Sequence, residues 1–400
     1  MRVRSALLSL LVSLVTIAAG VLLVAARPVE AATLRQITGF GSNPGNLQMF
    51  TYAPAGLATG RPLVVTLHGC GQTASVYANN TGWTELADRW GVALVVPQQQ
   101  TGNNSSRCFN WFVPGDISRG QGEALSIKQM VDWARSNYGS AADRIYVTGL
   151  SAGGAMTAAM MAAYPDVFAG GGIAAGVPYR CAESQSAAFT CMFSGVNLSP
   201  QQWGDKVRGA SSHAGPWPVL SVWHGTSDGT VVRANMTELV DQWTNVHGTD
   251  QTPDVSDTVA GYPHRVYRNG SGRAVVESFE ITGMGHGQPI DPGTGSTQCG
   301  LTGDSYIVDV NICSAYRMGL FWGIATSAPP PTTTTTAPPA VECFTSSNYA
   351  HVSAGRAYTT GGYTYAVGSN QAMGLYNTWV VHTLARTAPN YYVLADNGCP

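Results

Sequence analysis

A tract of proline and threonine divides the sequence and limits what the chain can fold into. It reads SAPPPTTTTTAPPA over residues 327–340. Such a tract lacks the apolar side chains that a core needs, so it is expected to stay extended as a stiff spacer. We therefore predict a linker over residues 327–341, a large folded unit over residues 32–326 and a small C-terminal module over residues 342–400.

The first 31 residues have the pattern of a secretory signal peptide. Arg2 and Arg4 precede an apolar run over residues 6–26. Small residues near Ala31 suit cleavage there, so we expect a secreted mature chain that begins at Ala32. The apolar run is also about as long as a membrane-spanning helix, so an uncleaved anchor is the alternative. Both interpretations imply export.

The charge balance of the chain argues against nucleic acid as a partner. The chain has 21 basic and 23 acidic residues, a formal net charge of −2. Removing residues 1–31 takes away three arginines and one glutamate, a net +2, so the charge becomes −4. A chain with this balance does not attract nucleic acid, and we expect none as a partner.

Eight cysteines in an exported chain favour disulfide bonds. None shows the close paired spacing of a zinc ribbon, so no structural metal is expected. Eight cysteines allow on the order of a hundred pairings, and the sequence does not fix the connectivity. The division of the chain favours neighbouring pairs, namely Cys70 with Cys108, Cys181 with Cys191, Cys299 with Cys313, and Cys343 with Cys399.

The large unit alternates short apolar runs with helical patterns, which is typical of an α/β fold with a mostly parallel sheet. Candidate strands are Leu63–Leu67, Val92–Val96, Ile145–Thr148 and Val219–Trp223. Ile127, Val131, Ala134 and Tyr138 share one helical face, and residues 152–163 form a helix of small residues suited to close contact with a sheet.

The most specific motif is the GxSxG pentapeptide of residues 149–153, which lies between a predicted strand and a predicted helix. Gly149 and Gly153 allow neighbouring backbone to pass without a Cβ clash. The turn exposes the hydroxyl of Ser151 at the start of the helix, so Ser151 is the candidate nucleophile.

A serine nucleophile needs a histidine base and a carboxylate that orients it, in the chain order Ser, Asp, His. Asp228 lies in HGTSDGTV, directly after the predicted strand 219–223, so we select it as the acid. Asp241 and Asp254 are weaker rivals because neither directly follows a convincing strand.

His286 is the candidate base because it lies late in the chain, in the glycine-rich loop GMGHGQP after a probable strand at residues 276–281. His68 and His224 each precede a glycine at a strand end, so we expect them to shape their loops. The histidines expected at the surface are His213, His247 and His264.

The tetrahedral intermediate of ester hydrolysis carries an oxyanion, which needs two N–H donors. One should be the backbone of Ala152, the residue after the nucleophile, and the other the backbone of Cys70, after the strand 63–67. The aromatic residues Trp111, Phe112, Trp203 and Trp217 could face substrate or fill the core; we favour the core for Trp111 and keep all four out of the catalytic set.

Four segments together resemble the extracellular polyhydroxybutyrate (PHB) depolymerases, whose catalytic domain recurs in feruloyl and acetylxylan esterases. They are LHGCGQ at 67–72, GLSAGGAMT at 149–157, HGTSDGTV at 224–231 and GMGHGQP at 283–289. The resemblance covers most of residues 34–326. It implies an α/β-hydrolase fold, ester hydrolysis without a cofactor, and Ser151, Asp228 and His286 as the catalytic residues.

The C-terminal module carries nine aromatic and three charged residues between Cys343 and Cys399. Such a surface suits a solid, weakly polar polymer, although some aromatics must form the core, since Tyr363 and Tyr365 alternate with small residues as in a strand. From residue 351 the module also resembles the substrate-binding modules of those depolymerases. That resemblance implies His351 and Arg356 as binding candidates.

We therefore predict a secreted, monomeric serine esterase that acts on polyhydroxyalkanoate. The alternative substrate is plant cell-wall xylan, cleaved by a feruloyl or acetylxylan esterase. The alternative from another class is a surface adhesin that keeps the fold without catalysis, which the complete set of serine, aspartate and histidine argues against.

Overall fold

The computed structural model describes residues 33–325, 342–388, 391–396, 398 and 399. Backbone contacts divide the chain into two compact units, with the division between Pro329 and Pro330. The expected signal peptide and the expected linker lie outside the described residues. No helix of the described ranges is long and apolar enough to cross a membrane.

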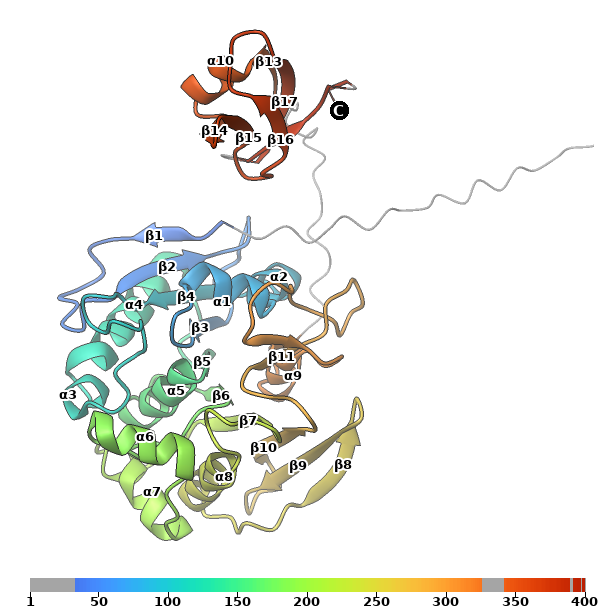
Figure 1. The fold of residues 1–400 in the computed structure, drawn as a ribbon. Coiled ribbons are helices and arrows are strands. Elements are labelled where there is room, and N and C mark those ends of the chain that lie inside the picture. The colour runs from blue at the N-terminus through green and yellow to red at the C-terminus, as the bar shows by residue number, and fades with distance from the viewer. Residues whose placement is uncertain (1–32, 326–341, 389–390, 397, 400) are drawn as a thin grey trace, which may run out of the picture. The chain divides into compact units, whose positions relative to one another are not determined.

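The large unit is built on a ten-stranded sheet with the order β1-β2-β4-β3-β5-β6-β7-β10-β9-β8 (Figure 1). The parallel strands are β3 (Leu63–Leu67), β4 (Ala93–Gln98), β5 (Ile145–Leu150), β6 (Gly170–Ala174), β7 (Val219–Gly225) and β10 (Ala274–Ile281). The antiparallel edge strands are β1 (Arg35–Ile37), β2 (Gln48–Tyr52), β8 (Val255–Val259) and β9 (Tyr262–Arg268). A separate two-stranded sheet joins β11 (Gln288–Ile290) to β12 (Ile307–Asp309).

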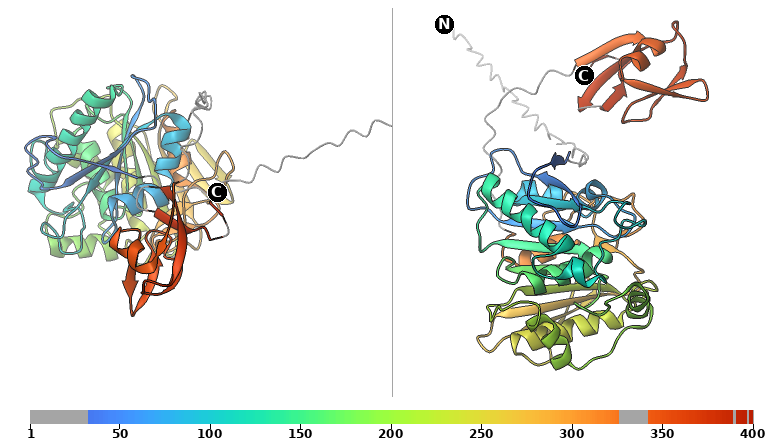
Figure 2. Two further views of the ribbon diagram at one scale, coloured as in Figure 1. Left: turned by 90° about the horizontal axis from the view of Figure 1, so that it is seen from above. Right: turned by 90° about the vertical axis from the view of Figure 1, so that its left-hand side faces the viewer.

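Helices cover both faces of this sheet (Figure 2). They are α1 (Ala74–Asn80), α2 (Trp83–Trp90), α3 (Pro114–Ile117), α4 (Gly122–Tyr138), α5 (Ala152–Ala163), α6 (Gln185–Ser194), α7 (Pro200–Arg208), α8 (Ala234–His247) and α9 (Ser314–Phe321). Strands β3 to β7 are buried along their whole length, as expected for parallel strands covered on both sides.

The three glycines of β6 show how closely the helices approach. Successive strand residues point to opposite faces of a sheet. A Cβ on Gly171 would collide with Met161 of α5, and a Cβ on Gly172 would collide with Met318 of α9. Helices α5 and α9 therefore lie on opposite faces, and β6 has no room for a side chain at Gly171 or at Gly172.

The predicted α/β class is confirmed, and every strand predicted in the large unit is present within two or three residues of its expected bounds. The predicted helical face also forms: Ile127, Val131 and Ala134 of α4 are buried, while Tyr138 is half-buried. All twelve residues of α5 are buried.

The C-terminal unit contains two three-stranded antiparallel sheets and one short helix among its described residues. Its elements are β13 (Glu342–Ser347), α10 (Asn348–Ser353), β14 (Ala357–Thr360), β15 (Tyr363–Ala366), β16 (Ala372–Leu375), β17 (Val381–Ala388) and β18 (Tyr391–Leu394). The sheets have the orders β13-β17-β18 and β14-β15-β16.

The predicted strand at Tyr363 and Tyr365 exists as β15, but its inward face is not the one that the tyrosines form. Thr364 and Ala366 are buried, whereas Tyr363 is exposed and Tyr365 is half-buried. Ala366, on the inward face of β15, belongs to a small hydrophobic core of five buried side chains. The five are Ala357, Ala366, Met373, Leu384 and Tyr392.

Four disulfides are present, and they join the pairs that chain division favoured. They are Cys70–Cys108, Cys181–Cys191, Cys299–Cys313 and Cys343–Cys399. Each unit is therefore cross-linked within itself.

Replacing both Cys343 and Cys399 with alanine should destabilise the C-terminal unit alone. The bond closes a loop with a sequence separation of 56 residues, for which loop entropy in the unfolded chain corresponds to about 4 kcal/mol. In calorimetry of the full chain we expect the small transition to move to lower temperature or vanish while the large one stays.

The matched control is the double alanine variant of Cys299 and Cys313, which should lower only the large transition. A single transition that both variants shift equally would contradict two independently folding units.

Candidate active site

Ser151 lies in a strained turn between β5 and α5. Its φ is 56° and its ψ −117°, which places a residue other than glycine in the left-handed half of backbone space. Its N–H donates to the carbonyl of Ala174 at 2.9 Å. A Cβ on Gly153 would collide with the carbonyl of Leu67 in β3, so only glycine lets α5 begin this close to the sheet.

Asp228 and His286 come together from two loops at the carboxyl ends of neighbouring strands β7 and β10. The Nδ1–H of His286 donates to Oδ2 of Asp228 at 2.8 Å. Oδ1 of Asp228 accepts from the N–H groups of Thr230 and Val231, each at 2.9 Å. The buried carboxylate is therefore held by the backbone of its own turn, and its free oxygen orients the histidine ring.

Opposing effects set the charge of Asp228. Burial alone would raise its pKa, but the hydrogen bond and charge of His286 and the two backbone donors outweigh burial and lower it. Asp228 is thus ionised when the ring beside it needs a carboxylate. His224 lies behind it, 3.5 Å from Oδ2, with Nε2–H directed to the carbonyl of Val231 at 2.7 Å. Burial lowers the pKa of His224, so that ring stays neutral.

A cavity of about 260 Å³ brings Ser151, His286 and Cys70 together. Its lining includes Ser151, His286, Cys70, Met192 and Tyr306. Within the described residues, Nε2 of His286 has no hydrogen-bond partner, and no bond joins it to the hydroxyl of Ser151. Such bonds are often long in unliganded hydrolases and shorten when substrate binds.

The loop after β3 leaves the backbone N–H of Cys70 without an acceptor in the described structure. Gly69 N donates to Oε1 of Gln72 at 2.8 Å, Gly71 N to the carbonyl of Ser106 at 2.8 Å, and Gln72 N to the carbonyl of Gly69 at 3.2 Å. The N–H of Cys70 has no acceptor among the described residues. At the first position of α5, Ala152 N–H also lacks one there, as expected at a helix start. These are the two donors that the sequence predicted for the oxyanion.

His68 orients this loop from below. Its Nε2 accepts the N–H of Gln99 at 3.1 Å, so Nδ1 carries the proton and donates to the carbonyl of Gly69 at 2.7 Å. Because the C=O and N–H of a trans peptide point in opposite directions, this bond directs the N–H of Cys70 away from His68. Burial lowers the pKa of His68 to about 4, so the ring is neutral. The prediction that His68 and His224 shape their loops agrees with these contacts.

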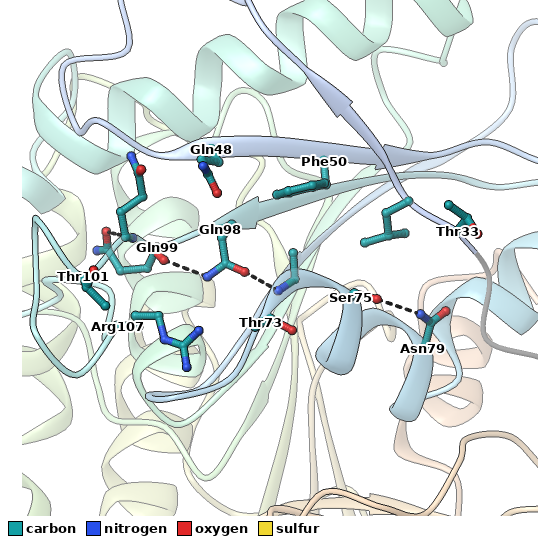
Figure 3. A pocket seen from close by; sticks show the side chains of 13 residues that line it. Thr33, Gln48, Phe50, Thr73, Ser75, Asn79, Gln98, Gln99, Thr101 and Arg107 are labelled. Carbon is teal, nitrogen blue, oxygen red and sulfur yellow. Dashed lines mark hydrogen bonds between the residues drawn. The ribbon is translucent and has the colours of Figure 1, made fainter. Parts of the chain in front are cut away.

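A second cavity, of about 680 Å³, lies beside α1 and contains none of the three candidate catalytic residues in its described lining (Figure 3). Its amides are already bonded to nearby loops: Oε1 of Gln98 accepts Ala74 N at 2.7 Å, and Nε2 of Gln99 donates to the carbonyl of Cys108 at 3.1 Å. Arg107 donates to the carbonyl of Gly71 at 2.6 Å. The residues that line this cavity therefore support the Cys70 loop. We place the chemistry in the smaller cavity.

Sequence reasoning missed a buried carboxyl group that helps to hold the segment around Gln99 and Cys108. Glu123, at the start of α4, accepts from Nε2 of Gln99 at 2.5 Å and from the N–H of Asn110 at 2.9 Å. Burial and the charge of Asp116 raise the pKa of Glu123 to about 8. Its partners lie far from it in sequence or in an irregular loop, so no local pattern reveals the role.

The rival acids lie elsewhere. Asp241 is on α8 and lines another cavity, and burial raises its pKa to about 6. Asp254 accepts the N–H of Arg268 at 2.6 Å. Neither contacts His286.

The three histidines expected at the surface are partly exposed, and each also has specific contacts. His213 bonds the carbonyl of Pro216 at 2.8 Å and His247 that of Pro218 at 2.9 Å. His264 stacks on Phe279 and contacts two carboxylates. Each ring packs against an irregular or edge segment that the sequence pattern does not reveal.

The aromatic candidates divide as follows. Trp111 and Trp203 are buried in a cluster beside α5 and α6, which supports the core interpretation of both. Phe112 is half-buried against that cluster, and Trp217 is half-buried against the main core. None of the four belongs to the lining of the smaller cavity in the described structure.

The binding candidates of the module have internal contacts. His351 is fully buried, and its Nε2 bonds the carbonyl of His382 at 3.0 Å. Nε of Arg356 donates to Nδ1 of His351 at 3.1 Å, and its guanidinium lies over the ring of Phe344.

Comparison with known proteins assigns this geometry to a family. Residues 47–257 match the family described as "Esterase PHB depolymerase". Poly(3-hydroxyalkanoate) depolymerase C of Paucimonas lemoignei is 58% identical over 292 residues, which cover 73% of this chain and 70% of that protein. Feruloyl esterase B of Talaromyces stipitatus is 34% identical, over 69% of this chain and 78% of that one.

A solved structure agrees. The acetyl xylan esterase from Aspergillus awamori superposes with a TM-score of 0.61 at 26% identity, over 73% of this chain and 100% of that one. The chain is thus a carboxylic ester hydrolase with an α/β-hydrolase fold. It belongs to the PHB depolymerase family of esterases. The adhesin alternative is therefore set aside.

Replacing Asp228 with asparagine should lower kcat on a soluble ester by about 10⁴-fold with little change in KM. An amide beside Nδ1 favours the wrong tautomer of His286 and cannot stabilise its protonated form. The measurement is steady-state hydrolysis of a p-nitrophenyl ester. Asp241→Asn is the matched control and should keep normal activity; a loss confined to that variant would move the acid to Asp241.

Replacing Glu123 with glutamine should flatten the pH dependence of stability. The raised pKa of Glu123 means that its stabilising contribution is fully present below about pH 4.5 and is lost as pH rises through about 8. Glutamine stays neutral throughout. The Tm of the large unit should fall between pH 5 and pH 9 in the native protein. In the variant this fall should be smaller by at least about 3 °C. Parallel curves for both proteins would show that Glu123 is ionised at pH 7.

Proposed function

We propose that this protein is a secreted depolymerase that hydrolyses the backbone esters of an insoluble polyhydroxyalkanoate through an acyl-enzyme on Ser151. The observation that carries the chemistry is the bond of 2.8 Å between Asp228 and His286, whose ring shares a cavity with Ser151. We assign the catalytic domain to residues 32–326 and the polymer-binding module to residues 342–400.

In the proposed mechanism, Nε2 of His286 takes the proton of the Ser151 hydroxyl as its oxygen attacks the ester carbonyl. Asp228 stabilises the protonated ring. The N–H groups of Cys70 and Ala152 donate to the oxyanion. His286 then protonates the departing alcohol, the acyl group stays on Ser151, and a water molecule activated by His286 releases the acid.

The choice of polyester over xylan rests first on relatedness. The depolymerase of Paucimonas lemoignei is 58% identical, against 34% for the feruloyl esterase. The xylan-directed esterases remain the second candidate, because their catalytic domains match over similar lengths.

The exposed side chains of the module also suit a solid polymer of low polarity. We use the name aromatic loop for Tyr376 and Trp379, in the loop after β16, together with Tyr349 at the start of α10. The rings of Tyr349 and Tyr376 lie 5.7 Å apart, and Trp379 is 86% exposed. Asn377 connects two of them, since its carbonyl accepts from Tyr349 N and its side chain from Trp379 N. Aromatic side chains held in this way present apolar area with little loss of entropy on binding.

His351 and Arg356 then act within the module. A buried imidazole bonded to the backbone of β17 and to Arg356 has no donor or acceptor left for a polymer. We therefore propose that these two residues hold α10 against β17, and that the aromatic loop makes the contact with polymer.

Export is proposed from two features. Residues 1–31 have the pattern of a cleavable signal. The four disulfides are typical of proteins that fold in an oxidising compartment.

The test is release of soluble hydroxyacids from suspended PHB granules, run beside release of ferulate and acetate from arabinoxylan. We expect the mature protein to clear the granules and to release little from arabinoxylan. Release from arabinoxylan alone would show that the substrate is a cell-wall ester.

Ser151→Ala is the control for mechanism. It should abolish clearing, by at least about 10⁴-fold, while the protein still sediments with the granules. Clearing that survives this change would place the nucleophile elsewhere.

A further inference from the structure

Helix α6 exposes two phenylalanine side chains beside the catalytic cavity. None of its ten residues, Gln185–Ser194, is charged. Phe189 and Phe193, one turn apart, are 51% and 52% exposed, and their rings stack at 5.9 Å. Two large exposed rings are unusual on a helix surface, where isolated apolar residues are the norm.

The helix is firmly held, so this exposure is a fixed feature. Ala188 and Cys191 are buried on its inner face, and a disulfide joins Cys191 to Cys181. The side chain of Asn235, on α8, donates to the carbonyl of Cys191 at 2.9 Å. Figure 1 shows α6 on the outside of the large unit, near α8.

The apolar face continues into the cavity. Met192 lies between Phe189 and Phe193 in sequence and lines the same cavity as Ser151 and His286. The carbonyl of Met192 accepts from the N–H of Val232 at 2.8 Å, which fixes it beside the Asp228 turn.

Another exposed aromatic residue, Tyr306, lies at the same cavity. Tyr306 is 47% exposed, lines the cavity and contacts the His286 ring edge-on at 5.9 Å. Asp304 positions it, because its Oδ1 accepts from both Tyr306 N at 2.8 Å and the side chain of Gln72 at 2.9 Å. The cavity is therefore bordered by apolar or aromatic side chains on α6 and in the loop before β12.

The chemistry of α6 selects the kind of partner. The side chains of Phe189, Met192 and Phe193 offer no N–H or O–H donor and no oxygen acceptor. A polysaccharide needs hydrogen bonds to its hydroxyl groups, whereas an aliphatic polyester surface has no donors and loses unfavourable contact with water when it is covered.

We propose that the outer face of α6, formed by Phe189 and Phe193, is a second polymer-contact surface that seats aliphatic polyester at the mouth of the Ser151 cavity. This inference rests on the proposed function. It separates two roles: the module holds the enzyme on the solid, and α6 presents a chain segment to Ser151.

The test uses the full-length mature chain with Phe189 and Phe193 both replaced by serine. We expect the hydrolysis rate per adsorbed molecule on PHB granules to fall at least about fivefold, because two half-exposed rings no longer contact the polymer. The amount adsorbed should stay similar, and hydrolysis of a soluble p-nitrophenyl ester should change less than about twofold.

Two variants serve as controls. Thr190→Ala changes the same exposed face without removing a ring and should behave as the native chain. Trp379→Ala, in the aromatic loop, should instead lower the amount of protein adsorbed.

Three outcomes would overturn the inference. They are an unchanged rate per adsorbed molecule in the double serine variant, an equal loss on the soluble ester, and a native dimer that this variant dissociates in sedimentation, since α6 would then bind a second copy. Failure of the proposed function is distinct, because the native chain itself would then leave the granules intact.

Discussion

The close approach of helix α5 to the parallel sheet is the constraint on which the site depends. Every residue of α5 is buried, and Gly153 has the carbonyl of Leu67 where a side chain would be. That contact lets the helix start directly at the end of β5 and forces Ser151 into its positive φ. The hydroxyl and the N–H of Ala152 are thereby fixed by the packing of the core, far more firmly than a surface loop could fix them.

The second half of the site is fixed by hydrogen bonds rather than by packing. A neutral His68 connects the Cys70 loop to β4, Gln99 continues the connection to Glu123, and the Cys70–Cys108 disulfide closes it. In an irregular loop, where no ladder supplies partners, such side-chain bonds satisfy the buried backbone groups. The N–H of Cys70 has no acceptor among the described residues, and it is the donor that we propose for the oxyanion.

The local parts of this arrangement were accessible from the sequence. Strand periodicity and the pentapeptide located Ser151, and chain order with strand ends selected Asp228 over Asp241. What depends on distant partners was not accessible: the sequence shows neither the bonds of Glu123 to Gln99 and Asn110 nor the contacts of His264 with Phe279 and two carboxylates. The alternation at Tyr363 and Tyr365 identified a strand but could not tell which set of side chains faces inward, because a period of two is the same on both faces.

The glycines of β6 have a consequence for the way this fold tolerates change. Methionines from opposite helices fill the space over Gly171 and Gly172, so the two helices pack directly against the backbone of this strand. Any added volume there must move α5 or α9, and α5 carries Ser151 at its first turn. Random mutagenesis scored by catalysis should therefore reveal β6 as sensitive although it contributes no group to the reaction. Its role is that of a spacer between α5 and α9.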